Sequence, residues 1–212
     1  MLTQPYVPWL ALLASVLMLG SYELRLWSAA RRDPTATARS CHRQLRELWV
    51  RALSAQPGTE LLAVQSLRNS LMSATINAST AALALMGSFS LMLSHDKSWE
   101  LTPGLLLRSL VSATLFAAYV CSALAMRYYH HAGFAMSLIA GSPLREEYTD
   151  VAARYVGSAG VLYSWSLRCF LYLAPIVGGL QSPLLMPPLT LVLLFVLVQF
   201  DRTPRLGSGA PQ

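Results

Sequence analysis

The sequence predicts an all-α integral membrane protein with four to five transmembrane helices and a small cytoplasmic helical layer. Of its 212 residues, 54% are hydrophobic and only 12% are charged, whereas an average soluble domain has about 25% charged residues. Three apolar stretches, 7–27, 61–93 and 105–126, are each long enough to cross a bilayer as a helix. We therefore expect one helical membrane domain over residues 1–206, followed by a disordered tail at 207–212.

The first stretch, 7–27, is expected to remain in the protein as a membrane anchor. A cleaved signal peptide begins with basic residues, but here the basic residues follow the apolar run. The next segment, about 35–56, is predicted to be an amphipathic cytoplasmic helix that either lies on the inner leaflet or packs against its neighbours. Its apolar face is read from residues spaced by three and four, which are Cys41, Leu45, Leu48 and Ala52.

The second stretch, 61–93, is long for a membrane span and contains a charge. Unbroken, it would measure about 50 Å, so one end must project beyond the bilayer. A charge at bilayer depth costs about 3 kcal/mol or more, unless it finds a partner or reaches the interface. The charged residue is Arg68. It belongs to a polar stripe that either lines a cavity or ion pathway or packs against another helix. Its members are Gln65, Arg68, Asn69, Ser73 and Asn77.

The third span, 105–126, is expected to continue as a helix into a cytoplasmic segment at about 127–160. A new helix should begin within that segment after Ser142-Pro143, because acidic residues follow directly and suit the positive end of a helix dipole.

The last third of the chain contains two further apolar helices. They cover residues 161–180 and 184–200, with a break at Ser182-Pro183 between them. They form either two full spans or one re-entrant pair that enters from the cytoplasmic side.

Basic residues in the connecting segments predict the orientation. They gather in 28–60, in 127–168 and in the tail, whereas only Lys97 lies in the loop 95–103. By the positive-inside rule, the N-terminus lies outside and the C-terminus is cytoplasmic, in the cell inner (plasma) membrane. Because topology and anionic headgroups explain the net charge of +6, we expect the lipid bilayer, and not nucleic acid, as partner.

Three charged residues near the inner ends of the spans are candidates for one charge network: Glu23, Arg168 and Asp201. Such a network, with Arg68 as a further candidate member, would bind the helices together. An arginine that is incompletely neutralised within it would attract an anion.

No motif points to a cofactor, a metal or an enzyme activity. His130 and His131 are adjacent, so on a helix they point about 100° apart and cannot readily chelate one ion. No nucleophile, zinc, phosphate-loop or dinucleotide signature is present. We therefore expect no cofactor and no bound metal, and catalysis has no support.

Several segments resemble an uncharacterised integral-membrane family, domain of unknown function 599. They are residues 63–75 around the Arg68-Asn69 pair, the run Tyr129 to Phe134, residues 163–175 and Asp201. The resemblance extends from about Tyr22 onward and implies a multi-span membrane protein, with no activity or residue role to carry over. Gly178-Gly179 departs from the bulkier residues expected there.

Two functions fit these observations. The first is an oligomeric channel-like or transport-like protein for a small anion, which self-associates through its second span. The second is a non-catalytic accessory or scaffold subunit of a larger membrane complex.

Overall fold

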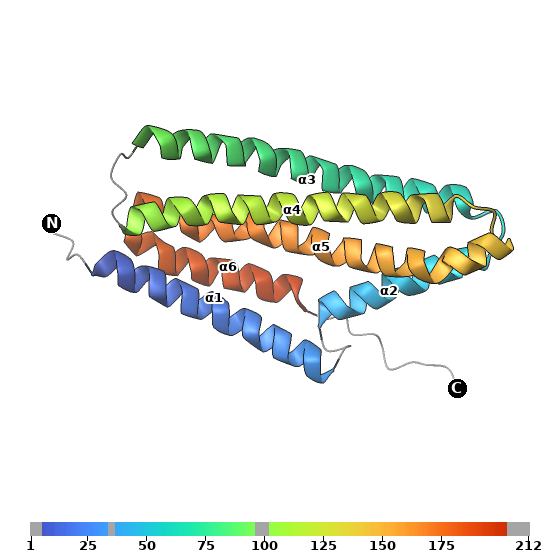
Figure 1. Cartoon of the computed structure of the whole chain (residues 1–212). Coiled ribbons are helices and arrows are strands. Elements are labelled where there is room, and N and C mark those ends of the chain that lie inside the picture. The colour runs from blue at the N-terminus through green and yellow to red at the C-terminus, as the bar shows by residue number, and fades with distance from the viewer. Residues whose placement is uncertain (1–5, 34–36, 96–101, 203–212) are drawn as a thin grey trace.

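The computed structural model of the protein describes residues 6–33, 37–95 and 102–202, with the side chains of 91–95 left undescribed. These residues form helices and turns and contain no strand, which confirms the all-α prediction. In chain order the elements are α1 (Val7–Arg32), α2 (Ala38–Ser54), α3 (Glu60–His95), α4 (Pro103–Met136), α5 (Pro143–Gln181), the 3-10 turn η1 (Pro183–Leu185) and α6 (Met186–Phe200), as Figure 1 shows.

Four helical units in the described part of the chain are long and apolar enough to cross a membrane. They are α1, α4, α5 and the unit Pro183–Phe200, which joins η1 to α6. The chain is therefore consistent with a multi-pass membrane protein. Helix α3 has 36 residues but carries the polar stripe and is not among these four units, so the span at 61–93 stays a prediction.

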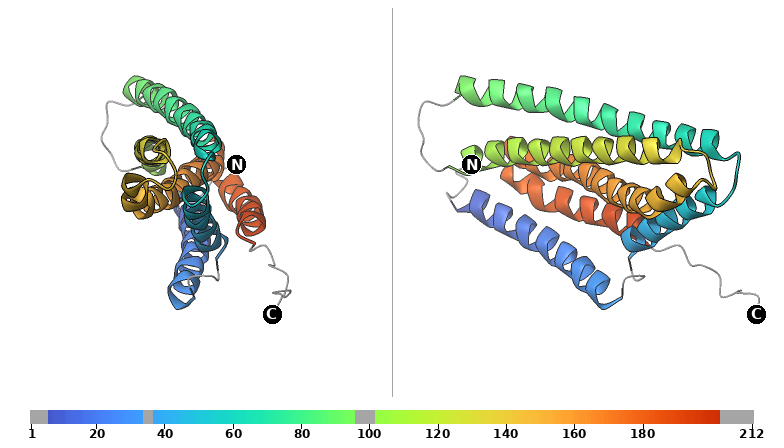
Figure 2. Two further views of the ribbon diagram at one scale, coloured as in Figure 1. Left: turned by 90° about the vertical axis from the view of Figure 1, so that its right-hand side faces the viewer. Right: turned by 45° about the vertical axis from the view of Figure 1, so that its right-hand side comes forward.

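The helices run side by side along one axis, with α4 and α5 as the central pair. In all views α3 and α1 lie on opposite sides of this pair (Figures 1 and 2). Helix α3 packs mainly on α4, and α1 packs on α6 and η1. We call the end that holds the α5–α6 turn the turn end, and the opposite end, which holds α2, the α2 end.

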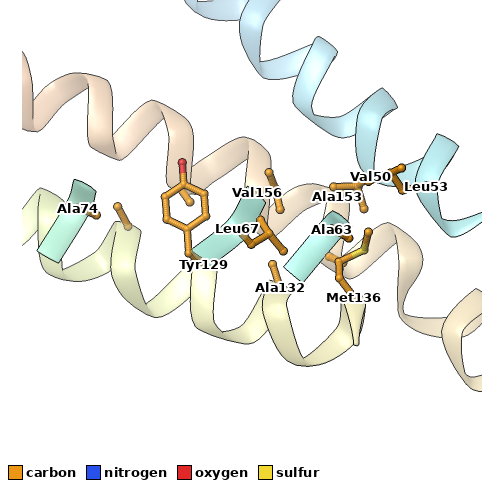
Figure 3. Packing of buried hydrophobic residues seen from close by; sticks show 13 residues of the cluster. Val50, Leu53, Ala63, Leu67, Ala74, Tyr129, Ala132, Met136, Ala153 and Val156 are labelled. Carbon is orange, nitrogen blue, oxygen red and sulfur yellow. The ribbon is translucent and has the colours of Figure 1, made fainter. Parts of the chain in front are cut away.

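Helices α4 and α5 are much longer than a bilayer core. With 34 and 39 residues they measure about 51 and 58 Å, against a hydrocarbon thickness of about 30 Å. Toward the α2 end they pack with α2 and the start of α3 around a separate apolar core (Figure 3). This core includes Val50, Leu53, Ala63, Leu67, Tyr129, Ala132, Met136, Ala153 and Val156.

Helix α5 joins two predicted elements into one. The helix begins after Ser142, as expected, and the Ser142 hydroxyl accepts the backbone N–H of Arg145 at 3.3 Å. It then continues through the predicted boundary near residue 160 to Gln181 without interruption. No proline stands at that boundary, and Gly157 and Gly160 are accommodated within the helix, so the α2 end and the membrane-length part share one continuous helix.

The face of α2 that packs on α5 differs from the predicted apolar face. Leu45 and Leu48 are 63% and 59% exposed, whereas Val50 is fully buried. Two glycines of α5 explain the difference, because a Cβ at Gly157 would meet the Glu47 side chain and a Cβ at Gly160 would meet that of Arg46. The glycines thus leave room for the long polar side chains of Glu47 and Arg46 on α2. Hydrophobic periodicity cannot predict this fit between small residues of one helix and polar residues of another.

The α5–α6 hairpin closes at the turn end. Gly178 and Gly179 allow a close approach, since a Cβ at Gly178 would meet Leu189 and a Cβ at Gly179 would lie 3.1 Å from the sulfur of Met186. Met186 shares a buried cluster with Leu107, in the first turns of α4. The hairpin therefore reaches the depth at which α4 begins, which favours two full spans over a re-entrant pair.

Candidate functional site

Arg168 on α5 joins three helices through two carboxylates. Its side chain is buried, with 4% of the residue exposed. One terminal nitrogen, Nη1, donates to Glu23 Oε1 on α1 at 2.6 Å. The other, Nη2, pairs with the carboxylate of Asp201 at the end of α6. The structure thus brings together Glu23, Arg168 and Asp201, which the sequence nominated as one network.

Three more side chains complete this network. The hydroxyl of Tyr172 donates to Glu23 Oε1 at 2.7 Å, and Arg39 Nη2 on α2 donates to Glu23 Oε2 at 3.1 Å. The hydroxyl of Tyr22 donates to Asp201 Oδ2 at 2.7 Å. Sequence analysis did not identify these three residues, although Tyr172 stands one helical turn after Arg168 and Tyr22 directly precedes Glu23. Two guanidinium groups balance two carboxylates, so the network is neutral.

The network lies at the boundary between the membrane-length part and the α2 end. Glu23 is about 24 Å along α1 from Val7, and Asp201 is about 27 Å from the start of η1. Both distances approach the bilayer core thickness of about 30 Å. Charges at such a depth are tolerated when they are paired and hydrogen-bonded, which explains why Arg168 has two acidic partners.

A cleft of about 730 Å³ opens beside the network, between α1, α2 and α5. Its lining includes Glu23, Arg39, Arg43, Trp27 and Trp165. The guanidinium carbon of Arg39 lies 4.7 Å from the centre of the Trp165 ring. This α1–α2–α5 cleft therefore carries two positive groups against one negative group.

The negative group in the cleft is already neutralised. Glu23 accepts hydrogen bonds from Arg168, Tyr172 and Arg39, which occupy both of its oxygens. Arg43, by contrast, is half exposed and bonds through Nε to Glu47 at 2.9 Å. The charges of these pairs balance, so what the cleft offers an anion is the guanidinium N–H donors of Arg39 and Arg43 that the described bonds do not use.

The polar stripe of α3 lies apart from the network. Gln65, Arg68 and Asn69 are exposed, and the Ser73 hydroxyl donates to the backbone carbonyl of Asn69 at 3.1 Å. The amide nitrogen of Asn77 is buried and has no hydrogen-bond partner within the described residues.

The depth of Arg68 follows from a packing contact nearer the turn end. Ala81 of α3 packs with Ala118 and Cys169, and Cys169 is the neighbour of Arg168. Arg68 therefore lies about 20 Å beyond the network, toward the α2 end. Arg68 is thus not a member of the network, and its role in an ion pathway stays a prediction.

The sequence matches, over residues 10–206, a family described as "Protein of unknown function, DUF599". The chain belongs to this family. The match confirms the resemblance drawn from the sequence segments, and it spans the network and the whole cleft. No curated protein and no solved structure matches the chain.

Arg145 forms a second polar centre at the α2 end that sequence analysis did not identify. The residue is fully buried. Its Nε donates to the hydroxyl of Ser54 at 3.1 Å, and its Nη1 donates to the carbonyls of Ala135 and Leu138, each at 3.0 Å. Because these carbonyls belong to the end of α4 and the turn after it, Arg145 acts as a C-terminal cap supplied by another helix.

Glu60 supports the same turn from α3. Its carboxylate accepts the backbone N–H of Ala140 at 2.8 Å. This hydrogen bond favours the charged form and holds the pKa of Glu60 below its ordinary value. Arg145 and Glu60 therefore shape the α4–α5 turn from two sides.

Histidine and acidic residues do not gather into a metal-binding arrangement in the described ranges. No group of three His, Cys, Asp or Glu side chains is placed to hold a metal ion there. The ring of His131 lies against that of Tyr155, with the ring centres 5.8 Å apart.

Proposed function

We propose that this protein is a transport-like membrane protein for a small anion, and that the anion binds in the α1–α2–α5 cleft. The observation that carries the proposal is that Arg39 and Arg43 line one cleft and that each is bonded to a carboxylate through a single nitrogen in the described residues, which leaves further guanidinium N–H donors for an anion. Arginine recognises carboxylate and phosphate oxygens through its planar set of N–H donors.

In this proposal Arg168 positions the site and does not bind the anion. It is buried and saturated by Glu23 and Asp201, so its charge is not available to a ligand. It fixes Glu23, and Glu23 in turn orients Arg39. Sequence analysis suggested that an arginine of the network attracts an anion. We assign this role to Arg39 and not to Arg168.

The proposed orientation follows the positive-inside rule. The α2 end carries most arginines and faces the cytoplasm, so the cleft opens at the inner boundary of the bilayer. The N-terminus lies outside, and the C-terminus is cytoplasmic.

The test is anion flux into liposomes that contain the purified full chain, with chloride and inorganic phosphate as probes. Arg39→Gln combined with Arg43→Gln should reduce flux of the transported anion by about tenfold or more, since two charged contacts are lost. Arg127→Gln, an exposed arginine of α4 outside the cleft, is the matched control and should leave flux unchanged. Equal flux in both variants, or no flux of either anion above that of empty liposomes, would refute the proposal.

A scaffold or accessory role is the second candidate function, and the exposed face of α3 supports it. Leu83 and Met86 are each 70% exposed on a helix that packs mainly against α4. Self-association through this face would also bring together the polar stripes of two copies. Native mass spectrometry of the chain extracted in mild detergent distinguishes the cases, because a scaffold retains a different partner protein and a homo-oligomer contains this chain alone.

A further inference from the structure

An apolar cavity continues from the α1–α2–α5 cleft toward the turn end. It has a volume of about 320 Å³ and lies between α1, α4, α5 and α6. Three residues, Gly20, Glu23 and Trp165, line both spaces, so the two spaces are neighbours and meet at these residues. Most of the other lining residues are apolar, and they include Val16, Leu19, Leu110, Ile176 and Met186.

The depth of this apolar cavity matches one leaflet of a bilayer. From Glu23 to Val16, α1 rises about 11 Å, whereas one leaflet of the hydrocarbon core is about 15 Å thick. The charged end of the combined space lies at the membrane boundary, where Trp27 and Trp165 stand. Tryptophan favours this interfacial level.

This layout fits an amphipathic ligand better than a free ion. A small inorganic anion gains nothing from an apolar space beside its site, whereas burying an acyl chain contributes about 0.8 kcal/mol for each CH₂ group. Glu23, at the junction, does not repel an anionic headgroup because its charge is offset by Arg168 and Arg39.

We propose that the ligand of the cleft is an anionic phospholipid from the surrounding leaflet. Its phosphate lies between Arg39 and Arg43, and one acyl chain enters the apolar cavity past Gly20. The inference rests on the proposed function, since both place an anionic group at the same two arginines. It adds the substrate class, a lipid.

Substitution of Gly20 tests acyl-chain binding separately from phosphate binding. A Cβ at this position would meet no atom within 4 Å, so a larger side chain can start there without a clash, and a leucine is expected to occupy the junction of the two spaces. Gly87 on α3 is equally open and lines neither space, so Gly87→Leu is the matched control. Gly20→Met is a second filling variant, with a more adaptable side chain.

The experiment measures binding of three probes to the full chain in detergent: dioleoylphosphatidylglycerol, dioleoylphosphatidylcholine and inorganic phosphate. Native mass spectrometry counts bound lipid, and tryptophan fluorescence follows phosphate. We expect phosphatidylglycerol to bind about tenfold more tightly than phosphatidylcholine. Gly20→Leu and Gly20→Met should weaken phosphatidylglycerol binding by about tenfold, and Gly87→Leu should not change it.

The outcomes separate this inference from the proposed function. If phosphatidylglycerol binding survives both Gly20 variants but falls in the Arg39→Gln, Arg43→Gln double variant, the acyl-chain inference is overturned and the anion site stands. Tighter binding of inorganic phosphate than of phosphatidylglycerol would likewise overturn it in favour of a free ion. If no probe depends on the two arginines, both proposals fail.

Discussion

Replacing Arg168 tests whether the network holds the helices together. In Arg168→Met, Glu23 keeps Arg39 and Tyr172, but Asp201, whose side chain is 9% exposed, keeps only the Tyr22 hydroxyl among the bonds described. Removing one partner of a buried ion pair costs about 3–5 kcal/mol. Because both carboxylates retain a donor, we expect a loss near the lower value, about 3 kcal/mol, in the free energy of unfolding.

Arg39→Met provides the comparison. Arg39 gives Glu23 one hydrogen bond, and the two side chains are 21% and 24% exposed, so its loss should cost about 1 kcal/mol or less. Both variants are measured by denaturant titration of the detergent-solubilised chain, followed by circular dichroism. In a double-mutant cycle, Arg168→Met and Asp201→Asn should show a coupling of about 1–3 kcal/mol. If Arg168→Met costs no more than Arg39→Met, the reasoning from burial is refuted.

Three further changes have defined outcomes. Arg145→Ala should lower the free energy of unfolding by about 2–3 kcal/mol, because several buried oxygens lose a charged donor; an unchanged melting midpoint would contradict this. Gly178→Ala should cost about 1–3 kcal/mol by crowding Leu189, whereas Gly20→Ala meets no atom, so equal melting midpoints would argue against close α5–α6 packing. Since the folded-state pKa of Glu60 lies below its ordinary value of 4.5, its stabilisation is present above that value and is lost as the pH falls through the lowered pKa. Glu60→Gln should therefore reduce the acid-induced fall in melting temperature, and an equal fall in both proteins would count against the Ala140 hydrogen bond.

The three central residues of the charge network could be predicted from the sequence because charged residues are scarce in apolar helices. Glu23, Arg168 and Asp201 each stand near one end of an apolar run, and a charge within such a run needs a partner. The membership of Arg39 in the network could not be predicted in this way, because Arg39 lies in a segment with many arginines. Only the fold shows which of them reaches Glu23.

The depth of Arg68 could not be read from hydrophobic periodicity. The start of α3 is apolar because Ala63 and Leu67 pack into the core at the α2 end. That core needs the same residue types as a membrane span, so the apolar run passes the bilayer boundary without a change in composition. Arg145 shows a related limit, because a guanidinium that caps the carbonyls of another helix has no fixed spacing in sequence.

The unbroken length of α5 joins the cleft, the charge network and the α4–α5 turn on one helix. Its one interior proline, Pro175, lies close to the turn end, so the long arm toward the α2 end contains no hinge of this kind. The helix is about 58 Å long, and its centre falls near Leu162. Val161 and Trp165 stand near that centre and form a wall of the cleft. The wall of the cleft, Arg168 of the network and the start of the helix beside the α4–α5 turn are therefore carried by one continuous helix, so none of them can shift along the helix axis without the others.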